Sequence, residues 1–195
     1  MIAVTVLRPL LAGLRLLLVM TVLLGVVYPA GVTLVAQAFP DQANGSRLTG
    51  TDGRVVGSAL IGQLFEGPQW FQARPSVSDY SGRTSGGSNL SPVSDDLAAL
   101  RAGRARVLAA ANPGAVGPVP EDALTASASG LDPHISPAYA QWQAPRVART
   151  RQLPLPEVES MIEAATEPAP LGYLGQDAVN VTRLNLMLQT REVRR

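Results

Sequence analysis

Two residue types are absent from this sequence, and a third occurs only once. Cysteine is missing, which excludes disulfides, thiolate metal sites and thiol nucleophiles, and leaves the redox compartment unassigned. Lysine is missing too, so all 16 basic residues are arginine; this excludes a Schiff-base lysine and the lysine of a phosphate-binding loop. His134 is the single histidine and the carboxylates do not cluster, so no metal site is predicted. The net charge of +1 does not indicate a nucleic-acid partner.

Charge is absent from a long hydrophobic run near the N-terminus. The 24 residues from Leu16 to Phe39 include no charged side chain, and about 20 apolar residues suffice to cross a bilayer as a helix. Ala36-Gln37-Ala38 fits the cleavage pattern of a signal peptide, but the run exceeds the roughly 7–15 residues of a signal core. Pro29 interrupts the run, which transmembrane helices tolerate. The length favours an uncleaved anchor and predicts a short tail (1–11), a transmembrane helix (12–38) and one domain (39–195).

The distribution of arginines around this run predicts an orientation. Arg8 and Arg15 precede the span with no acid nearby, so the positive-inside rule places the N-terminus in the cytoplasm. Two arginines that follow the span lie among aspartates and weaken the asymmetry. Long downstream domains are translocated largely regardless of charge. The domain is therefore expected outside the cytoplasm.

The domain itself reads as a small mixed α+β fold. Asp52-Gly53 is typical of a two-residue hairpin turn, Ser91 or Ser94 is a candidate helix cap, and Ser136-Pro137 is typical of a helix start. Pro145 predicts either a kink or a restart in that helix. Segment 178–189 leaves strand and helix open, since its apolar residues alternate in two phases. The expected elements, in chain order, are a hairpin (47–58), a polar loop (79–92), and helices at 91–112, 136–150 and from 156.

The stretch "LTASASGLDPHIS", residues 124–136, contains the residue types of a nucleophilic site. Ser129, Asp132 and His134 supply a hydroxyl, a carboxylate and an imidazole, but one short turn would have to aim all three at a single point, and triad members normally come from separate elements. No G-x-S-x-G elbow is present. Serine, aspartate and glycine are also the residues that shape turns. The turn interpretation is favoured, and a membrane-anchored envelope hydrolase using Ser129 and His134 remains the alternative.

Other short motifs carry weaker signals. The loop "SGGSNLS", residues 85–91, has glycines that permit backbone amides to converge on an anion, but it lacks the lysine and the helix start of a phosphate site. Asn44-Gly45-Ser46 fits a glycosylation sequon. Trp70, Phe71, Tyr139 and Trp142 are expected in a core or at a partner contact.

Several strings, taken together and in order, resemble one family. The chain is similar to the KdpC family, accessory subunits of the bacterial potassium-transporting P-type ATPase (the Kdp system), over nearly its whole length. Residues 113–123 and the C-terminal tail carry no recognisable motif, and Gln189 stands where members often have an acid. The strings that carry the resemblance are "VVYPAG", "QANGS", "GSALIGQLF", "RPS", "SGGSNLSP", "TASASGLDPHISPAYAQWQAPRVA" and "VNVTRLNLML".

The resemblance implies a place in a complex of the bacterial inner membrane. Its partners would be a channel-like potassium-binding subunit, a P-type subunit that hydrolyses ATP through a phospho-aspartate, and a small membrane peptide. Members of the family are described as catalytic chaperones that raise the ATP affinity of the pump subunit. This chain has no D-K-T-G phosphorylation string, so it is expected to have no catalytic, cofactor or metal residues, while the complex handles ATP and potassium.

The motif residues are therefore expected to shape the domain or to contact partners. Since ATP lies inside the cell and the domain is expected outside it, any effect on ATP affinity would be conformational coupling. A secreted binding protein cleaved after Ala38 is a further alternative. The candidate contact or structural residues are Asn44, Gly45, Ser46, Gly86, Gly87, Asn89, Ser127, Ser129, Gly130, Asp132, His134, Trp142, Arg146, Asn180 and Asn185.

Overall fold

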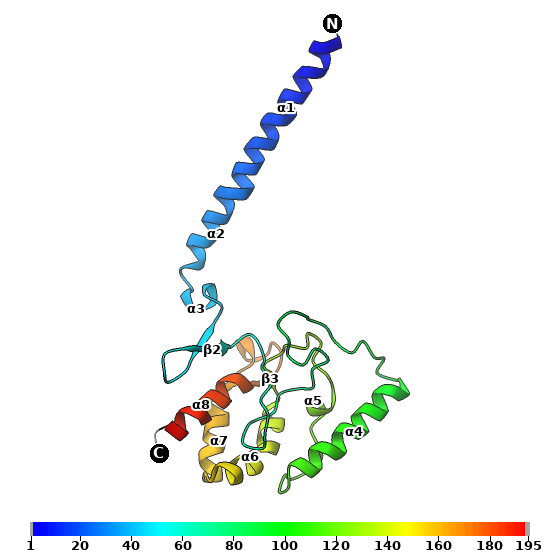
Figure 1. Cartoon of the computed structure of the whole chain (residues 1–195), viewed down its shortest axis with the longest axis vertical. Helices are drawn as coiled ribbons and strands as arrows, with labels where there is room; N and C mark the ends of the chain where they lie inside the picture. The colour runs from blue at the N-terminus through cyan, green and yellow to red at the C-terminus, as the bar shows by residue number, and fades with distance from the viewer. Residues whose placement is uncertain (1, 194–195) are drawn as a thin grey trace. The chain divides into compact units, whose positions relative to one another are not determined.

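The computed structural model of this chain describes residues 2–193, which divide into two compact units between Ser46 and Arg47. The first unit is helical, and the second combines helices with two small sheets (Figure 1). This confirms the predicted fold class, an N-terminal apolar helix followed by a mixed α+β domain.

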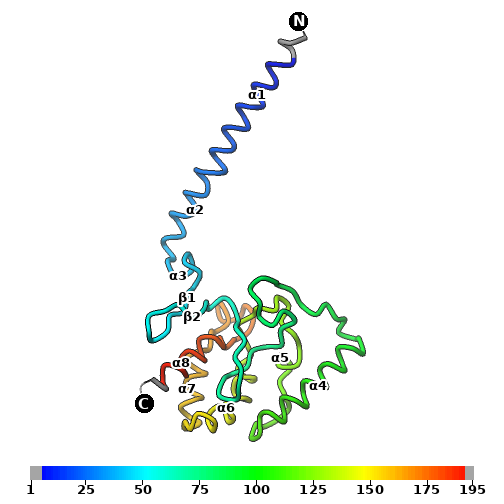
Figure 2. The backbone as a smooth tube through the Cα atoms, viewed as in Figure 1, coloured from blue at the N-terminus to red at the C-terminus, as the bar shows by residue number. Residues whose placement is uncertain are grey.

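The N-terminal unit is a long helix with one wide turn. It consists of α1 (Ile2–Val22), the π-helical turn η1 (Leu23–Val27) and α2 (Tyr28–Ala36), followed by the short α3 (Pro40–Ala43) (Figure 2). In η1 the Tyr28 N–H donates to the carbonyl of Leu23, five residues back. Pro29 follows directly and has no N–H to continue the regular ladder, so the π turn accommodates the proline without breaking the helix.

This helix is long and apolar enough to cross a membrane. Among the described residues, the candidate span is Val6–Ala36, 31 residues. At about 1.5 Å per residue such a helix exceeds the roughly 30 Å of the hydrocarbon core. The helix predicted at 12–38 thus lies mostly within a longer helical segment.

The second unit contains a hairpin, a three-stranded sheet and five α-helices. The antiparallel hairpin pairs β1 (Arg47–Thr49) with β2 (Val55–Ser58), and the sheet has the order β3-β5-β4 with antiparallel neighbours. The remaining elements are α4 (Asp95–Ala111), α5 (Glu121–Leu124), β3 (His134–Ile135), α6 (Pro137–Arg151), α7 (Leu155–Ala164), β4 (Thr166–Glu167), the 3-10 turn η2 (Pro170–Gly172), β5 (Ala178–Asn180) and α8 (Val181–Val193).

Local signals located most helix ends correctly. The Ser94 hydroxyl accepts the N–H of Leu97 at 3.2 Å and begins α4, and the Ser136 hydroxyl accepts the N–H of Tyr139 at 3.0 Å and begins α6. The ambiguous segment 178–189 is strand β5 followed at once by α8. Capping residues are readable from sequence because their hydrogen bonds are local.

Three expectations need correction. Thr49 pairs with Val55 and only Gly53 in the turn has a positive φ, +77°, so the hairpin turn is longer than two residues. Helix α6 passes through Pro145 as one helix. None of the residues of α4 is buried, and Val107, expected on an apolar face, is 69% exposed.

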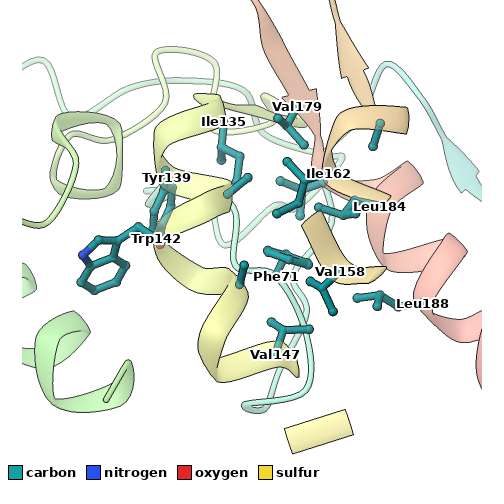
Figure 3. Packing of buried hydrophobic residues seen from close by; sticks show 14 of the residues in the cluster. Phe71, Ile135, Tyr139, Trp142, Val147, Val158, Ile162, Val179, Leu184 and Leu188 are labelled. Atoms are coloured by element: carbon teal, nitrogen blue, oxygen red, sulfur yellow. The ribbon is translucent and has the colours of Figure 1, made fainter. Parts of the chain in front are cut away.

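The core surrounds Phe71, which belongs to a segment with no regular secondary structure. Phe71 is fully buried and lies among side chains such as Val147, Val158 and Leu184 (Figure 3). A buried irregular segment must satisfy its main-chain polar groups elsewhere, because leaving them unpaired costs about as much as a lost hydrogen bond.

Two side-chain amides satisfy this segment from the helices. Asn185 of α8 accepts the N–H of Phe71 and donates to its carbonyl, both at 2.9 Å. Gln143 of α6 does the same for Gln72, accepting its N–H at 2.7 Å and donating to its carbonyl at 3.0 Å. Each amide therefore replaces the strand that would otherwise pair with the segment.

Two arginines of α6 bind the carbonyls just before this pair. Arg146 donates to the carbonyls of Pro68 and Trp70, and Arg151 donates to the carbonyl of Gln69 at 2.6 Å. The Arg151 guanidinium also lies over the Trp70 ring, 4.2 Å from its centroid. Five consecutive carbonyls, those of residues 68–72, are thus bound by side chains of α6 and α8.

We expect Asn185→Leu to lower the free energy of unfolding by on the order of 2–4 kcal/mol, because it leaves the buried N–H and carbonyl of Phe71 unpaired. The measurement is chemical denaturation of the full chain in detergent. Gln189→Leu is the matched control, since Gln189 lies exposed on the same helix. A loss no larger in Asn185→Leu than in this control would contradict the assigned role of the amide.

Candidate functional site

The turn from Ser127 to His134 is built by its own hydroxyls and carboxylate. The buried Ser127 hydroxyl accepts the N–H groups of Gly130 at 3.0 Å and Asp132 at 3.4 Å. Gly130 has a φ of +69°, and a Cβ there would lie 2.9 Å from the carbonyl oxygen of Gly86. Only glycine fits this position, because the backbone is left-handed and the neighbouring chain is in contact.

The glycine-rich loop packs its backbone directly on this turn. The Gly86 N–H donates to the carbonyl of Ser129 at 2.9 Å, and the hydroxyl of Ser85 donates to the same carbonyl at 3.0 Å. A Cβ on Gly87 would lie 3.0 Å from the carbonyl oxygen of Ala128. Asn89 has a positive φ of 52°. Since the Gly86 amide is already bound to protein, the loop serves to support the turn, and it does not form an anion cradle.

Ser129, Asp132 and His134 do not form a nucleophilic triad. The Ser129 hydroxyl accepts the N–H of Leu131 at 3.1 Å. His134 Nδ1 lies 3.4 Å from Asp132 Oδ1, and His134 Nε2 lies 3.2 Å from Glu167 Oε2. A histidine with a carboxylate at each ring nitrogen has no nitrogen left to take a proton from serine. This geometry argues against the hydrolase alternative.

His134 is instead the centre of a chain of charges. Asp132 Oδ2 lies 3.4 Å from Arg74 Nη1 at one end, and Glu167 Oε1 lies 3.1 Å from Arg183 Nη1 at the other. The five charges come from a loop, the turn, β3, β4 and α8. Sheet pairing brings them together, since β5 lies between β3 and β4 and joins directly to α8.

Sequence reasoning missed Arg74, Glu167 and Arg183. No local pattern links them to the turn, because Glu167 lies 33 residues after His134 and Arg74 lies 58 residues before Asp132. Arg74 lies in the "RPS" string that contributes to the family resemblance, and this string is the one signal in the sequence that points to it.

The charges shift the pKa values of the two central groups in opposite directions. For His134, the hydrogen bond with Asp132 raises the pKa above 6.5; burial opposes this, and Glu167 adds to the rise. For Asp132, burial alone would raise the pKa, but hydrogen bonds from His134 and the positive charges of His134 and Arg74 outweigh burial and lower it below 3.8. Both shifts favour the charged pair.

The other candidate residues lie in two further places. Asn44, Gly45 and Ser46 end the N-terminal unit, where Asn44 Nδ2 donates to the carbonyl of Pro40 at 2.7 Å and Gly45 and Ser46 have positive φ values of 82° and 47°. The larger polar and aromatic candidates, Trp142, Arg146, Asn180 and Asn185, are buried in the second unit. Their hydrogen bonds to main-chain carbonyls assign them to holding the fold.

An open hollow of about 480 Å³ lies beside the turn. Leu60 and Ile61 form its apolar wall, and residues 127–133 contribute to the rest. The exposed fraction is 60% for Leu60 and 43% for Ile61. The Gly62 N–H donates to the carbonyl of Leu131 at 2.8 Å, which holds this wall against the turn. A rigid turn next to exposed apolar side chains is suited to protein contact.

Comparison with known proteins identifies relatives over almost the whole chain. A family model described as KdpC, the c chain of the K+-transporting ATPase, matches residues 10–190. The potassium-transporting ATPase KdpC subunits of Caulobacter vibrioides and Methylococcus capsulatus are each 50% identical to this chain, over 95% and 90% of it and over 93% and 94% of their own lengths. That of Sorangium cellulosum is 51% identical, over 93% of this chain and 96% of its own length.

The charge chain predicts a pH dependence of stability. Because the pKa of His134 is raised on folding, its contribution is complete below 6.5 and is lost as the pH rises through the folded value; the lowered pKa of Asp132 places its loss at the acidic end, as the pH falls below 3.8. Between about pH 6 and about pH 9, we expect chemical denaturation to show a falling free energy of unfolding, and His134→Gln to remove most of that fall. The chain has one histidine and no cysteine or lysine, so no other side chain obscures this range. Equal slopes in both proteins would contradict the prediction.

Proposed function

This chain belongs to the KdpC family and is an accessory subunit of a K+-transporting ATPase; from that premise we propose that it stabilises a high-affinity potassium import complex and raises the ATP affinity of its pump subunit. The observation that carries the accessory role, beside the family match, is the state of the turn at 127–134. Its histidine is bound by carboxylates and its serines by main-chain amides. Such a site binds and shapes, and performs no chemistry.

The proposed partners are a channel-like potassium-binding subunit, an ATP-hydrolysing P-type subunit and a small membrane peptide. The helix Val6–Ala36 would pack against the channel-like subunit, since almost all of its side chains are exposed in the isolated chain. The hollow beside Leu60 and Ile61 would receive part of the same subunit. Exposed apolar surface next to a rigid, hydrogen-bonded turn supports this assignment.

The proposed location is the bacterial inner membrane, with the N-terminus in the cytoplasm and the second unit outside it. Arg8 and Arg15 precede the apolar run without compensating acids, which supports this orientation. ATP then lies on the other side of the membrane from the domain. An effect on ATP affinity would be a coupling free energy between two conformations of the complex, to which this chain binds unequally.

Assembly is tested by affinity purification of the full chain from detergent-solubilised membranes. We expect the multi-span ATPase subunits to be recovered with it, and Leu60→Arg to lower their recovery by about tenfold because it buries an unpaired charge. Val116→Arg is the control, since Val116 is 90% exposed and lies outside the hollow. In purified complexes, loss of this chain should raise the ATP concentration for half-maximal hydrolysis. Recovery of the chain alone would overturn the proposed function.

Topology is tested by protease treatment of sealed vesicles of both orientations. Trypsin cleaves after arginine, and Arg106 lies exposed on α4, so we expect digestion only when the extracytoplasmic face is outward. A domain cut only from the cytoplasmic side would contradict the proposed orientation. Mass measurement of the same chain tests the anchor, because a mature N-terminus at Phe39 would show cleavage after Ala38.

A further inference from the structure

Helix α4 is attached to the domain by polar contacts instead of a buried apolar face. Its half-buried side chains form one stripe, and the two arginines of that stripe bind α5. Arg101 forms an ion pair with Glu121, and Arg104 Nη1 donates to the carbonyl of Leu124 at 2.7 Å. None of the residues of α4 is buried. A helix with this little packing normally has its apolar face covered by something else.

The adjacent stripe of α4 faces an open apolar groove. The groove has a volume of about 920 Å³ and lies between α4 and residues 63–80 of the same unit. Its α4 wall is Ala99, Leu100, Gly103 and Val107, at the spacing of one helix face. Leu100 is 46% exposed and Val107 is 69% exposed. A Cβ built on Gly103 meets no atom within 4 Å, so the groove is open at its middle.

The opposite wall is fixed by its own hydrogen bonds. Asp79 and Tyr80 both have left-handed backbone, with φ values of 48° and 56°. The Tyr80 hydroxyl donates to the carbonyl of Arg74 at 2.7 Å, and its ring lies against Gly62. Burial, with the charge of Asp132, raises the pKa of Tyr80 to about 12, so the hydroxyl keeps its proton. This wall is formed before anything binds.

The uncompensated charges of the groove are negative. Asp79 and Asp96 both line it and are exposed, and neither has an ion pair among the described residues. The two arginines in the lining are already engaged, Arg74 with Asp132 and Arg104 with the Leu124 carbonyl. An occupant that matches this surface is apolar along its length and carries a basic side chain at the aspartate end.

We propose that this groove receives an apolar segment of another subunit, with an arginine or lysine of that segment paired to Asp79 and Asp96. The inference rests on the proposed function, which supplies the partner. A lipid with an anionic head group does not fit, because it would place like charge beside the two aspartates. Docking would cover the face of α4 that the isolated chain leaves exposed.

The position of the occupant is tested by photocrosslinking in the complete complex. A benzophenone amino acid at Gly103 points into the groove, and one at Ala102 is the control, since Ala102 is exposed on the same helix and does not line the groove. We expect crosslinks to another subunit from position 103 and few from position 102. With the complex intact, no crosslink from 103, a crosslink to lipid or a second copy, or equal crosslinks from both positions would overturn the inference and leave the proposed function standing. A chain that purifies without other subunits would defeat the proposed function itself.

The charge match is tested with neighbouring aspartates. Asp96 lines the groove and Asp95 does not, although both are exposed in the first turn of α4. We expect Asp96→Arg to lower the recovery of the other subunits by about tenfold, and Asp95→Arg to leave it close to that of the unaltered chain. Both substitutions change the helix dipole equally, so equal recoveries would overturn the proposed ion pair. Thermal unfolding of each variant verifies that the chain is folded.

Discussion

The second unit depends on how the main chain of residues 68–72 is satisfied. This segment is buried but belongs to no helix or sheet, and side chains of α6 and α8 bind each of its five carbonyls. Asn185 and Gln143 each take both polar groups of one residue, as a neighbouring strand would. Because unpaired main-chain groups are costly when buried, these bonds allow Phe71 to occupy the centre of the core.

From this fixed segment the chain continues into the parts that matter for function. Arg74 reaches the charge chain through Asp132, and the carbonyl of Pro75 accepts the N–H of Ser127 at 2.9 Å. Ser76 donates to the carbonyl of Gly130 at 2.7 Å. The turn at 127–134 is therefore held both by the buried segment and by the glycine loop. Its rigidity follows from satisfied hydrogen bonds and not from apolar packing, as expected for a connecting segment that presents a surface.

Two kinds of surface result, and they differ in how complete they are. The turn with its charge chain is internally paired from Arg74 to Arg183, so it offers shape to a partner. The groove beside α4 is not paired, since its apolar stripe and its two aspartates face open space. A subunit of a membrane complex is expected to combine such features, because its apolar faces are covered only in the assembly.

The sequence by itself determined the features that arise from neighbouring residues. These are the membrane-spanning helix, the caps at Ser94 and Ser136, and the turn chemistry of residues 127–134, because each depends on a run of composition or on bonds a few residues long. The family resemblance was also legible, since it lies in ordered strings. Only the tertiary structure decided that His134 lies between two carboxylates, that Asn185 binds Phe71 across 114 residues, and that the apolar positions of α4 stay exposed. Those contacts join segments far apart in the chain, and the helical spacing of α4 is the same whether its apolar face meets its own domain or another protein.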